Sequence, residues 1–374
     1  MNKRLGLYLH IPFCMQKCLY CDFCSFPDTT QERMEAYVEE LCRRMDRAAK
    51  SCPEHTLVDS IYFGGGTPSL MTDRMFHRLL SCIHHRYLLD DDCEITVECN
   101  PATVTHGKLA LFRALGINRL SIGLQSANDR ELALLGRLHS FADCQQTVFD
   151  AREAGFDNIS VDLMYGIPEQ TLDSFTHTLE QVLALSPEHI SAYGLKIEED
   201  TPFAAMRPSL PLPDEDTEWE MYRLCCRTLG THGYQRYEIS NFAKCGKESR
   251  HNLRYWEQKE YLGFGVAAHS YFGGERFGNS RDLSAFLRGE DIVTERTKLT
   301  PTDIRNEYVM LRLRLSKGLS LSEYRERFGT ELERECPAIA AFVSGGLLQK
   351  ENDRLFFTDR GFFVSNAVLS ELLL

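Results

Sequence analysis

Apolar runs typical of strands alternate with amphipathic stretches typical of helices through the first half of the chain. Six runs are rich in apolar and β-favouring residues: 5–10 (LGLYLH), 60–63, 94–98, 119–123, 159–164 and 189–195. Between them lie stretches with helical periodicity, such as 32–49 and 173–185. This alternation predicts an α/β protein with a parallel sheet, built either as an open doubly wound sheet or as an incomplete (β/α)6 barrel.

The pattern changes after a proline-rich break at residues 207–218. A helix is predicted over about 215–232, and a glycine-rich segment follows at 237–274. From about residue 300 the pattern predicts two helices, a β-hairpin around Asn352 and Asp353, and a last helix. We therefore expect three regions. They are a core at 1–206, a helical and glycine-rich extension at 207–298 that completes the core, and a winged-helix-like α+β domain at 299–374.

Composition and charge exclude several classes of protein. The chain has 374 residues, of which 43% are hydrophobic and 26% charged, as in ordinary globular proteins. The net charge is −12, and residues 301–374 carry ten Lys or Arg against eleven Asp or Glu, so we expect no nucleic-acid partner. The N-terminus is basic and then apolar, but His10 and Pro12 interrupt the run. We expect a strand there rather than a signal peptide, and a cytoplasmic protein.

Unusual residues follow each of the six predicted strands. In chain order they are a cysteine cluster, Gly64-Gly65-Gly66 with Thr67, Glu98, Gln125, Asp162 and Lys196. The carboxyl ends of parallel strands form the functional edge of both candidate architectures. We therefore expect these residues to share one pocket. Glu98 could accept hydrogen bonds from a ribose diol, and Asp162 is expected to face the interior and to need a partner.

Four of the fourteen cysteines fall within the stretch HIPFCMQKCLYCDFCSF, residues 10–26. They could form disulfides, bind zinc, hold an iron–sulfur cluster, or simply be buried. A reducing compartment disfavours disulfides, and zinc commonly takes two well-separated C-x2-C pairs. Cys14, Cys18 and Cys21 instead form C-x3-C-x2-C, which suits three corners of a cubane cluster with one iron left open.

The motif C-x3-C-x2-C, with Tyr20 before the last cysteine, resembles the signature of the radical S-adenosylmethionine (SAM) superfamily. Further segments, such as YFGGGTPS, RLSIGLQS, VDLMYGIPEQT and ESRHNLRYW, extend the resemblance to nearly the whole chain. They are similar to the oxygen-independent coproporphyrinogen III oxidase-like branch, and most of all to its heme chaperones. The resemblance implies that the cysteines ligate a [4Fe-4S] cluster whose fourth iron binds SAM, and that electron transfer cleaves SAM to a 5′-deoxyadenosyl radical.

The resemblance also implies site residues. The cluster ligands would be Cys14, Cys18 and Cys21. The cluster-bound SAM would be lined by Tyr8, Tyr20, Gly65, Glu98 and His269. In the oxidase a second SAM is held by residues that match Gly66, Thr67, Gln125, Arg137, Asp162 and Lys196, and Lys196 stands where the oxidase has a small residue. His251 and Tyr255, from the motif H-N-x-x-Y, are candidate heme ligands that would lie one turn apart on a helix.

Two departures from the oxidase separate the candidate functions. The oxidase has C-x-C after the third cysteine, whereas here Phe23 takes that place and Cys24 stands one residue later. Only thirteen residues precede Cys14, fewer than in the oxidase. Both favour a heme chaperone over coproporphyrinogen decarboxylation. A radical SAM enzyme with another substrate is the third alternative. Cys24 is expected not to ligate the cluster.

A heme chaperone of this kind would need particular partners. The resemblance implies a heme-accepting protein, which could be membrane-associated, and an electron donor such as flavodoxin or ferredoxin. The sequence leaves open whether the protein is a monomer or a homodimer.

Overall fold

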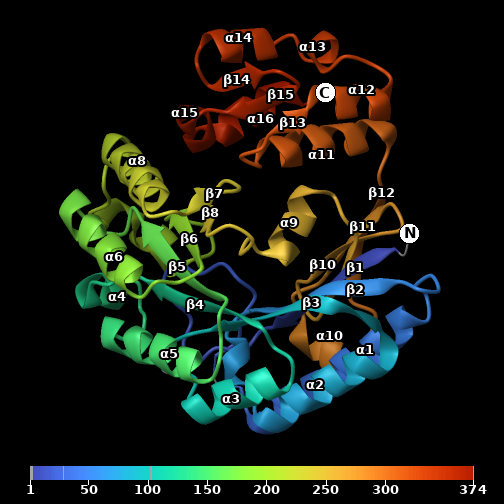
Figure 1. Cartoon of the computed structure of the whole chain (residues 1–374). Coiled ribbons are helices and arrows are strands. Elements are labelled where there is room, and N and C mark those ends of the chain that lie inside the picture. Colours follow the sequence, from blue (N-terminus) through green and yellow to red (C-terminus); the bar gives the residue numbers. More distant parts are fainter. Residues whose placement is uncertain (1–2, 28, 102, 374) are drawn as a thin grey trace.

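The core of the fold is a run of six neighbouring parallel strands (Figure 1). The computed structural model describes residues 3–27, 29–101 and 103–373. The six strands are β1 (Arg4–Ile11), β2 (Leu57–Gly65), β3 (Leu88–Cys99), β4 (Arg119–Gln125), β5 (Ile159–Tyr165) and β6 (His189–Gly194), paired in chain order. In β1, Leu5, Leu7 and Leu9 on one face have no exposed surface and His10 on the other face is 5% exposed, as expected for a strand covered on both faces. The predicted parallel sheet is confirmed.

Helices fill the connections between these strands and lie along one side of the sheet (Figure 1). They are α1 (Gln31–Ala49), α2 (Asp73–Arg86), α3 (His106–Ala114), α4 (Asp129–Leu134), α5 (Phe141–Glu153) and α6 (Leu172–Ala184), with a short 3-10 turn, η1 (Pro68–Leu70). Each α-helix begins after a Thr, Ser or Asn whose side chain accepts a hydrogen bond from a backbone N–H of the first turn. The helices predicted over 32–49 and 173–185 are therefore confirmed to within one residue.

Two strands are longer than their apolar runs. The first residues of β2 and β3 pair with one another, Leu57 with Leu88 and Val58 with Leu89. The next residues of β3 are Asp90, Asp91 and Asp92, which are half-buried or exposed. This part of the strand has no alternating apolar pattern, because ion pairs of Asp90 with Arg4 and of Asp92 with Arg250 help to hold it, so the sequence pattern did not indicate a strand there.

Strands from residues 207–298 extend the sheet at both ends. Beside β1 lie β9 (Tyr261–Phe264), β10 (His269–Phe272), β11 (Glu275–Asn279) and β12 (Val293–Lys298); beside β6 lie β8 (Asn241–Ala243) and β7 (Gln235–Arg236). The remaining elements of this region, and of the segment just before it, are α7 (Pro202–Met206), η2 (Arg207–Ser209), α8 (Glu215–Thr231), α9 (Arg250–Trp256) and α10 (Leu283–Leu287). Among the described residues the two end strands, β12 and β7, do not pair with each other, so the barrel is incomplete, as expected.

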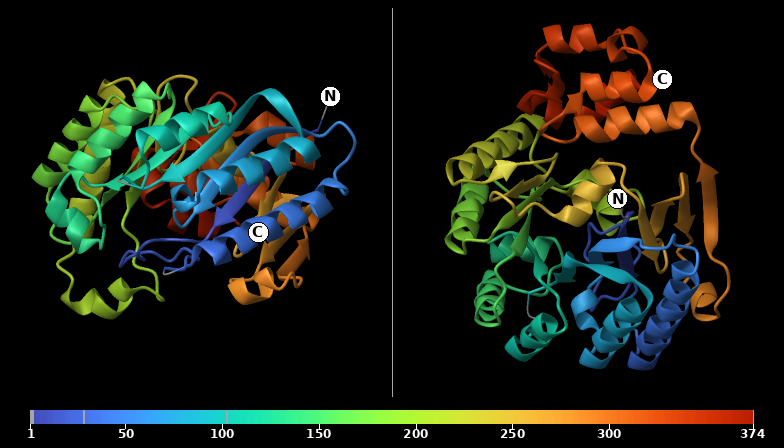
Figure 2. Two further views of the ribbon diagram at one scale, coloured as in Figure 1. Left: turned by 90° about the horizontal axis from the view of Figure 1, so that it is seen from below. Right: turned by 45° about the vertical axis from the view of Figure 1, so that its right-hand side comes forward.

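The C-terminal part is a small α+β unit that follows β12 and lies above α9 (Figures 1 and 2). Its elements are α11 (Pro301–Leu313), β13 (Leu319–Ser320), α12 (Leu321–Phe328), α13 (Leu332–Glu335), α14 (Ile339–Ser344), β14 (Leu348–Glu351), β15 (Arg354–Phe357), α15 (Asp359–Phe363) and α16 (Ser365–Leu372). The predicted hairpin is confirmed: β14 and β15 pair around Asn352, which has a positive φ of 50°. The strand order β13–β15–β14 fits the winged-helix-like expectation.

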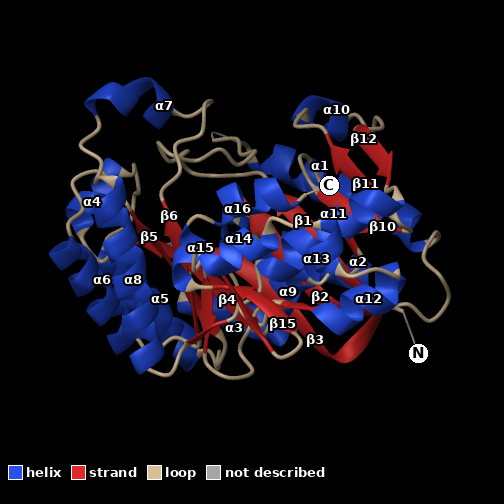
Figure 3. Cartoon of the chain, turned by 90° about the horizontal axis from the view of Figure 1, so that it is seen from above, coloured by secondary structure: helices blue, strands red, loops and turns tan. Residues whose placement is uncertain are grey.

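The loop that carries the cysteines lies between two flanking segments. Figure 3 shows α7 and α10 on either side of the loops at one edge of the molecule. The backbone N–H of Phe203 in α7 donates to the carbonyl of Leu19, and Arg281, before α10, pairs with Asp22 at 3.5 Å. Both contacts hold the cysteine loop at the carboxyl ends of the strands.

In the part of the chain that the structure describes, no helix combines the length and apolar character that a bilayer crossing requires.

Candidate functional site

The cysteine loop runs from the end of β1 to the start of α1 and is closed at its base. The N–H of Phe26 donates to the carbonyl of Pro12 at 2.7 Å, and the N–H of Cys14 donates to the carbonyl of Phe26 at 3.3 Å. Inside the loop the N–H of Cys21 donates to the carbonyl of Cys18 at 3.2 Å, which forms a tight turn. This backbone pairing brings the three predicted ligands to one side of the loop.

One cavity at the carboxyl ends of β1 to β5 joins this loop to the strand tips. Its lining includes all three predicted ligands, Cys14, Cys18 and Cys21, and eight of the predicted SAM residues, Tyr20, Gly65, Gly66, Thr67, Glu98, Gln125, Arg137 and Asp162. The shared pocket that the strand tips predicted is therefore present for the first five strands. The cavity is also lined by Gln16, Asn100 and Ser121, which the sequence analysis did not select.

Two of the three predicted ligands, Cys14 and Cys21, are kept protonated by their surroundings when no metal is bound. Burial is the main cause that raises the pKa of the Cys14 and Cys21 thiols, that of Cys21 to about 11, and the neighbouring thiols contribute to both shifts. Such thiols keep their protons until a cation displaces them. Among the described residues no three His, Cys, Asp or Glu side chains already surround one point as metal ligands, so a cluster would require the thiols to turn toward it.

A chain of hydrogen bonds links two of the cysteines. The Thr67 hydroxyl donates to the sulfur of Cys14 at 3.7 Å and accepts from the Asn100 amide at 3.0 Å. Arg137 completes the chain, because it donates to Asn100 Oδ1 at 2.7 Å and to the sulfur of Cys18 at 3.5 Å. Hydrogen bonds to sulfur are one means by which a protein sets the potential of an iron–sulfur cluster, so the donor set fits a [4Fe-4S] cluster.

The glycine triplet is required by close packing against the cysteine loop. A Cβ atom on Gly66 would lie 2.7 Å from the carbonyl oxygen of Phe13 and 3.0 Å from the sulfur of Cys14. Gly65 has a φ of +117°, which side chains rarely adopt, and a Cβ there would lie 2.6 Å from the His10 ring. Glycine therefore lets β2 end directly against the cluster loop.

Two carboxylates occupy the inner wall of the cavity. The Tyr62 hydroxyl and the Gly65 N–H each donate to the Glu98 carboxylate at 2.9 Å, and burial raises the pKa of Glu98 to about 7. Asp162 accepts from the Ser121 hydroxyl at 3.3 Å, and burial raises its pKa as well. The expected inward-facing Asp162 and its polar partner are present. Tyr62 was missed because it occurs within an otherwise apolar strand.

Three of the predicted SAM residues are not among the described residues that line this cavity. The Lys196 side chain is 78% exposed and pairs with Glu198. His269 lies in a separate cavity, with residues of β11, β12 and α11. Tyr8 lies behind the wall, where its hydroxyl donates to His10 Nδ1 at 3.1 Å and its ring stacks on Tyr62. The strand pattern placed Lys196 at a strand end and the resemblance supplied Tyr8 and His269, but neither could orient the side chains.

Cys24 is turned away from the cavity. It is 7% exposed, and its thiol lies 4.0 Å from the carbonyl oxygen of Arg281, on the flank that carries α10. Its own carbonyl accepts a hydrogen bond from His10 Nε2 at 2.8 Å. This placement agrees with the expectation that Cys24 does not ligate the cluster.

The two candidate heme ligands lie one turn apart on α9 and bond to each other. His251 Nε2 and the Tyr255 hydroxyl are 2.9 Å apart, while His251 Nδ1 bonds to the Ser60 hydroxyl at 3.0 Å. His251 is 1% exposed and stacks on the ring of Tyr62, and burial lowers its pKa to about 3, so the ring is neutral. Both ring nitrogens are thus engaged, and ligation of iron would require one of these bonds to break.

Sequence comparisons and the fold define the class of protein. Residues 8–182 match the radical SAM superfamily, and residues 299–364 match the HemN C-terminal domain. The structure is similar to that of the coproporphyrinogen III oxidase HemN from Escherichia coli, with a TM-score of 0.88 over 100% of this chain and 90% of that chain, at 24% sequence identity. That similarity establishes a radical SAM fold with a HemN-type C-terminal domain, and radical SAM proteins carry a [4Fe-4S] cluster and SAM.

Similarity over the whole length narrows the class further. The chain is 34% identical to the heme chaperone HemW of Bacillus subtilis over 98% of each chain. It is 35% identical to that of Haemophilus influenzae and 34% identical to that of Escherichia coli, each over 99% of this chain and 98% of the relative. The chain therefore belongs to the heme chaperone HemW family.

Proposed function

We propose that this protein is a heme chaperone that binds heme together with a SAM-ligated [4Fe-4S] cluster and passes the heme to an acceptor protein. The observation that carries the proposal is that similarity to heme chaperones extends through 98–99% of the chain, including the C-terminal unit, rather than through the cluster-binding part alone. The proposed organisation into a core at 1–206, an extension at 207–298 and a C-terminal domain at 299–374 agrees with this, since strands of the extension pair with both ends of the core sheet.

The cluster would be held by Cys14, Cys18 and Cys21. When bound, it would supply the electron that cleaves SAM. Thr67 and Arg137 would hold the sulfurs by the hydrogen bonds they already donate to Cys14 and Cys18. Glu98 keeps lone pairs beyond those used by Tyr62 and Gly65, so it would accept hydrogen bonds from the ribose hydroxyls of SAM.

The mouth of the cysteine cavity has an exposed apolar rim that would suit heme. Met15 is 62% exposed, Phe23 is 66% exposed and Leu138 is 64% exposed. All three lie on loops next to the thiols: Phe23 lines the cysteine cavity itself, and Met15 and Leu138 line an adjoining cavity that shares Cys18 with it. Clustered exposed apolar side chains mark binding surfaces, and the faces of a porphyrin are broad and apolar. We propose that heme, or the acceptor that receives it, contacts this rim.

The partners follow from the proposed function. A heme-accepting protein is needed to receive the heme, and we propose that it can be membrane-associated. A reductant is needed for the cluster, and flavodoxin or ferredoxin would have the required electron-transfer chemistry. Lys17 lies on the cysteine loop itself and offers a positive charge to a docking electron donor, whereas Asp22 is paired with Arg281.

Anaerobic reconstitution with iron and sulfide tests the cluster assignment. Cys21→Ser should lose most of its cluster iron and its reduced-state EPR signal, because one of three sulfur ligands is removed. The unaltered, reconstituted protein, given SAM, reductant and coproporphyrinogen III, distinguishes the two candidate functions. Heme binding without formation of protoporphyrinogen supports the chaperone, whereas formation of protoporphyrinogen would assign the oxidase activity instead. Release of 5′-deoxyadenosine reports whether SAM is cleaved.

Tyr255→Phe tests the heme ligands more sharply than deletion of His251. The substitution removes only the hydroxyl that bonds His251 Nε2, so it frees that nitrogen for iron. Heme affinity, followed by the Soret band, should rise if His251 is the ligand and should fall if the Tyr255 oxygen is the ligand. Unchanged affinity would remove both residues from the heme site. Tyr261→Phe is the matched control, because Tyr261 packs on the Tyr255 ring but bonds to Arg276.

A further inference from the structure

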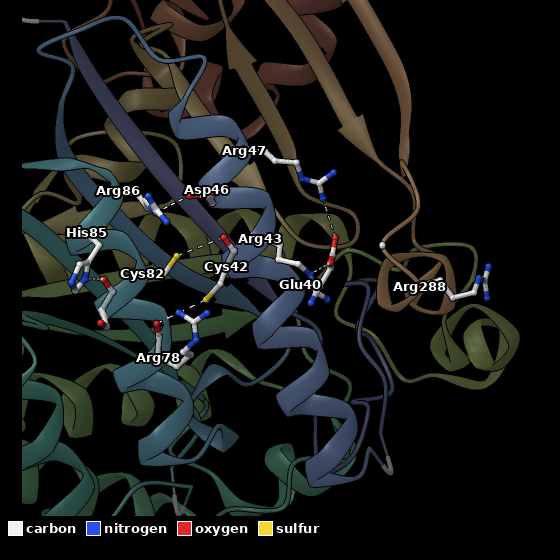
Figure 4. Close-up of a pocket in the computed structure, with 12 residues that line it drawn as sticks. Glu40, Cys42, Arg43, Asp46, Arg47, Arg78, Cys82, His85, Arg86 and Arg288 are labelled. Atoms are coloured by element: carbon white, nitrogen blue, oxygen red, sulfur yellow. Dashed lines mark hydrogen bonds and ion pairs between the residues drawn. The ribbon is translucent and has the colours of Figure 1, made fainter.

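A second cavity lies on the outer surface of the molecule, between α1, α2 and the loop after α10 (Figure 4). Its volume is about 910 Å³, and none of its lining residues belongs to the cysteine cavity. Most of its charged lining is basic, with Arg43, Arg47, Arg78, Arg86 and Arg288 against Glu40 and Asp46. Two cysteines, Cys42 and Cys82, also line it, and the proposed function gives them no role.

Cys42 and Cys82 lie against each other's helices. The Cys82 thiol contacts the carbonyl oxygen of Cys42 at 3.6 Å, and the Cys42 thiol contacts the carbonyl oxygen of Arg78 at 3.9 Å. Arg78 is one turn before Cys82 on α2, so each sulfur sits at the level of the other residue. Figure 4 shows both sulfurs in the space between the two helices, beside Arg78.

The surroundings of the pair give the two thiols different pKa values. The neighbouring Cys42 thiol, together with Arg78 and Arg86, lowers the pKa of Cys82 to about 7, although burial and Asp46 oppose this. The neighbouring Cys82 thiol and burial raise the pKa of Cys42. Burial raises the pKa of other core cysteines, such as Cys144, to about 12. Cys82 therefore has the thiolate character of a reactive cysteine, and Cys42 has the character of the thiol that would resolve it.

We propose that Cys42 and Cys82 form a redox-active dithiol, which a hydroperoxide converts into a disulfide that links α1 to α2. The Cys82 thiolate attacks the peroxide, so an S–O bond forms, the O–O bond breaks and the hydroxide or alkoxide leaves as water or alcohol. The Cys42 sulfur then attacks Cys82, the S–S bond forms and a second water leaves. Two thiols and one hydroperoxide thus give one disulfide, one water, and one further water or alcohol.

The disulfide would act on a helix that supports the cysteine loop. On α1, the Tyr37 hydroxyl donates to the carbonyl of His10 at 2.9 Å and accepts from the N–H of Val266 at 3.1 Å. A covalent link to α2 would fix α1, and with it the segment that leads into Cys14. The proposal concerns the chemistry of this pair and does not depend on the heme function.

Peptide mapping of the reconstituted, cluster-loaded protein tests the proposal. Trypsin places Cys42 in the peptide 34–43 and Cys82 in the peptide 79–86, and neither peptide contains another cysteine. After one equivalent of hydrogen peroxide and alkylation of the remaining thiols, we expect the two peptides joined by a disulfide that dithiothreitol releases. If both peptides are instead recovered singly, alkylated or over-oxidised, the proposal is wrong.

Two variants test the order of the steps. In Cys42→Ser the thiol that would resolve the sulfenic acid is absent, so dimedone should trap a sulfenic acid at Cys82. In Cys82→Ser the trapping at Cys42 should be at least about tenfold lower, since a difference of one pKa unit changes the thiolate fraction about tenfold. Equal trapping would overturn the assignment of Cys82 as the attacking thiol. Cys52→Ser, on the same side of the fold but outside this cavity, should form the cross-link as the unaltered chain does. If either variant fails to fold, the cross-link in the unaltered chain still decides.

Discussion

Replacing Gly66 with alanine would create a steric clash with the cysteine loop. The new Cβ would lie 2.7 Å from the carbonyl oxygen and 2.9 Å from the nitrogen of Phe13, and 3.0 Å from the sulfur of Cys14. Two of these three atoms are backbone, so no side-chain rotation relieves the contact. Ordinary contacts begin at 3.4 Å, so the Phe13 oxygen would have to move by about 0.7 Å (3.4 − 2.7).

That movement is opposed by the hydrogen bonds that join the two segments. The N–H of Gly66 donates to the carbonyl of Ile11 at 2.9 Å, and the N–H of Thr67 donates to the carbonyl of Phe13 at 2.7 Å. Overpacking of a well-packed site costs roughly 1–3 kcal/mol. We expect Gly66→Ala to lower the free energy of unfolding by about that amount and to lower the cluster content, because Cys14 is displaced with Phe13.

Two measurements on each variant separate these effects. Urea unfolding of the cluster-free protein reports stability, and iron and sulfide per chain after reconstitution report the site. Gly107→Ala is the matched control: nothing lies within 4 Å of its Cβ, and it is in α3, where alanine is favoured over glycine by roughly 0.5–1 kcal/mol. Full cluster content and unchanged stability in Gly66→Ala would refute the packing argument.

Three further predictions concern other buried groups. Burial raises the pKa of Glu238 from 4.5 to about 7, so the native state binds the extra proton between these values and its stability falls as pH rises through them. The unfolding free energy relative to Glu238→Gln should therefore fall by up to about 3 kcal/mol between about pH 4 and pH 8, and a difference independent of pH would contradict it. Cys24→Ser should keep its full iron content, since the thiol faces the carbonyl of Arg281; loss of iron would make Cys24 a ligand. Asn100→Ala should shift the reduction potential of the cluster, measured by EPR-monitored titration, because Thr67 and Arg137 lose the amide that joins them; an unchanged potential would count against the hydrogen-bond chain.

The sequence predicted the parts of the fold that have a repeating physical cause. Apolar strands alternating with capped amphipathic helices dictate a parallel sheet, and the carboxyl ends of its strands must meet at one edge. That is why Glu98 and Asp162, far apart in the chain, could be placed in the same cavity as the cysteines. The hairpin at Asn352 was predictable for a similar reason, since a local turn joins two short apolar runs.

Positions that depend on a single side-chain orientation or on distant pairing could not be predicted. β10 and β11 form a local hairpin around Gly273 and Gly274, but the cavity that holds His269 also needs β12 and α11, and no local pattern marks how these pack there. Lys196 follows β6 but leaves the sheet to pair with Glu198. Asn100 was overlooked although it comes two residues after Glu98, because its importance comes from two partners, Thr67 and Arg137, on other strands' loops.

The motif around His251 has a structural explanation that stands beside its proposed role with heme. The backbone N–H groups of Arg250 and His251 both donate to the Glu94 carboxylate at 3.2 Å, which fixes the start of α9 against β3. Arg254 is 2% exposed, pairs with Asp59 and donates to the carbonyl of Glu260 at 2.8 Å.

Through these contacts α9 fills the interior of the incomplete barrel. A Cβ on Gly6 of β1 would lie 2.5 Å from Arg254 Cδ, so the strand that leads into the cysteine loop packs closely against this helix. Removing a buried partner from such a network costs about 1–3 kcal/mol per unsatisfied group. A loss of heme binding in His251→Ala could therefore arise from movement of β1 and β2. Tyr255→Phe keeps the ring and its packing and removes one hydroxyl, so a change in heme affinity that Tyr261→Phe does not share reports ligation, while urea unfolding measures the cost of leaving His251 Nε2 without its partner.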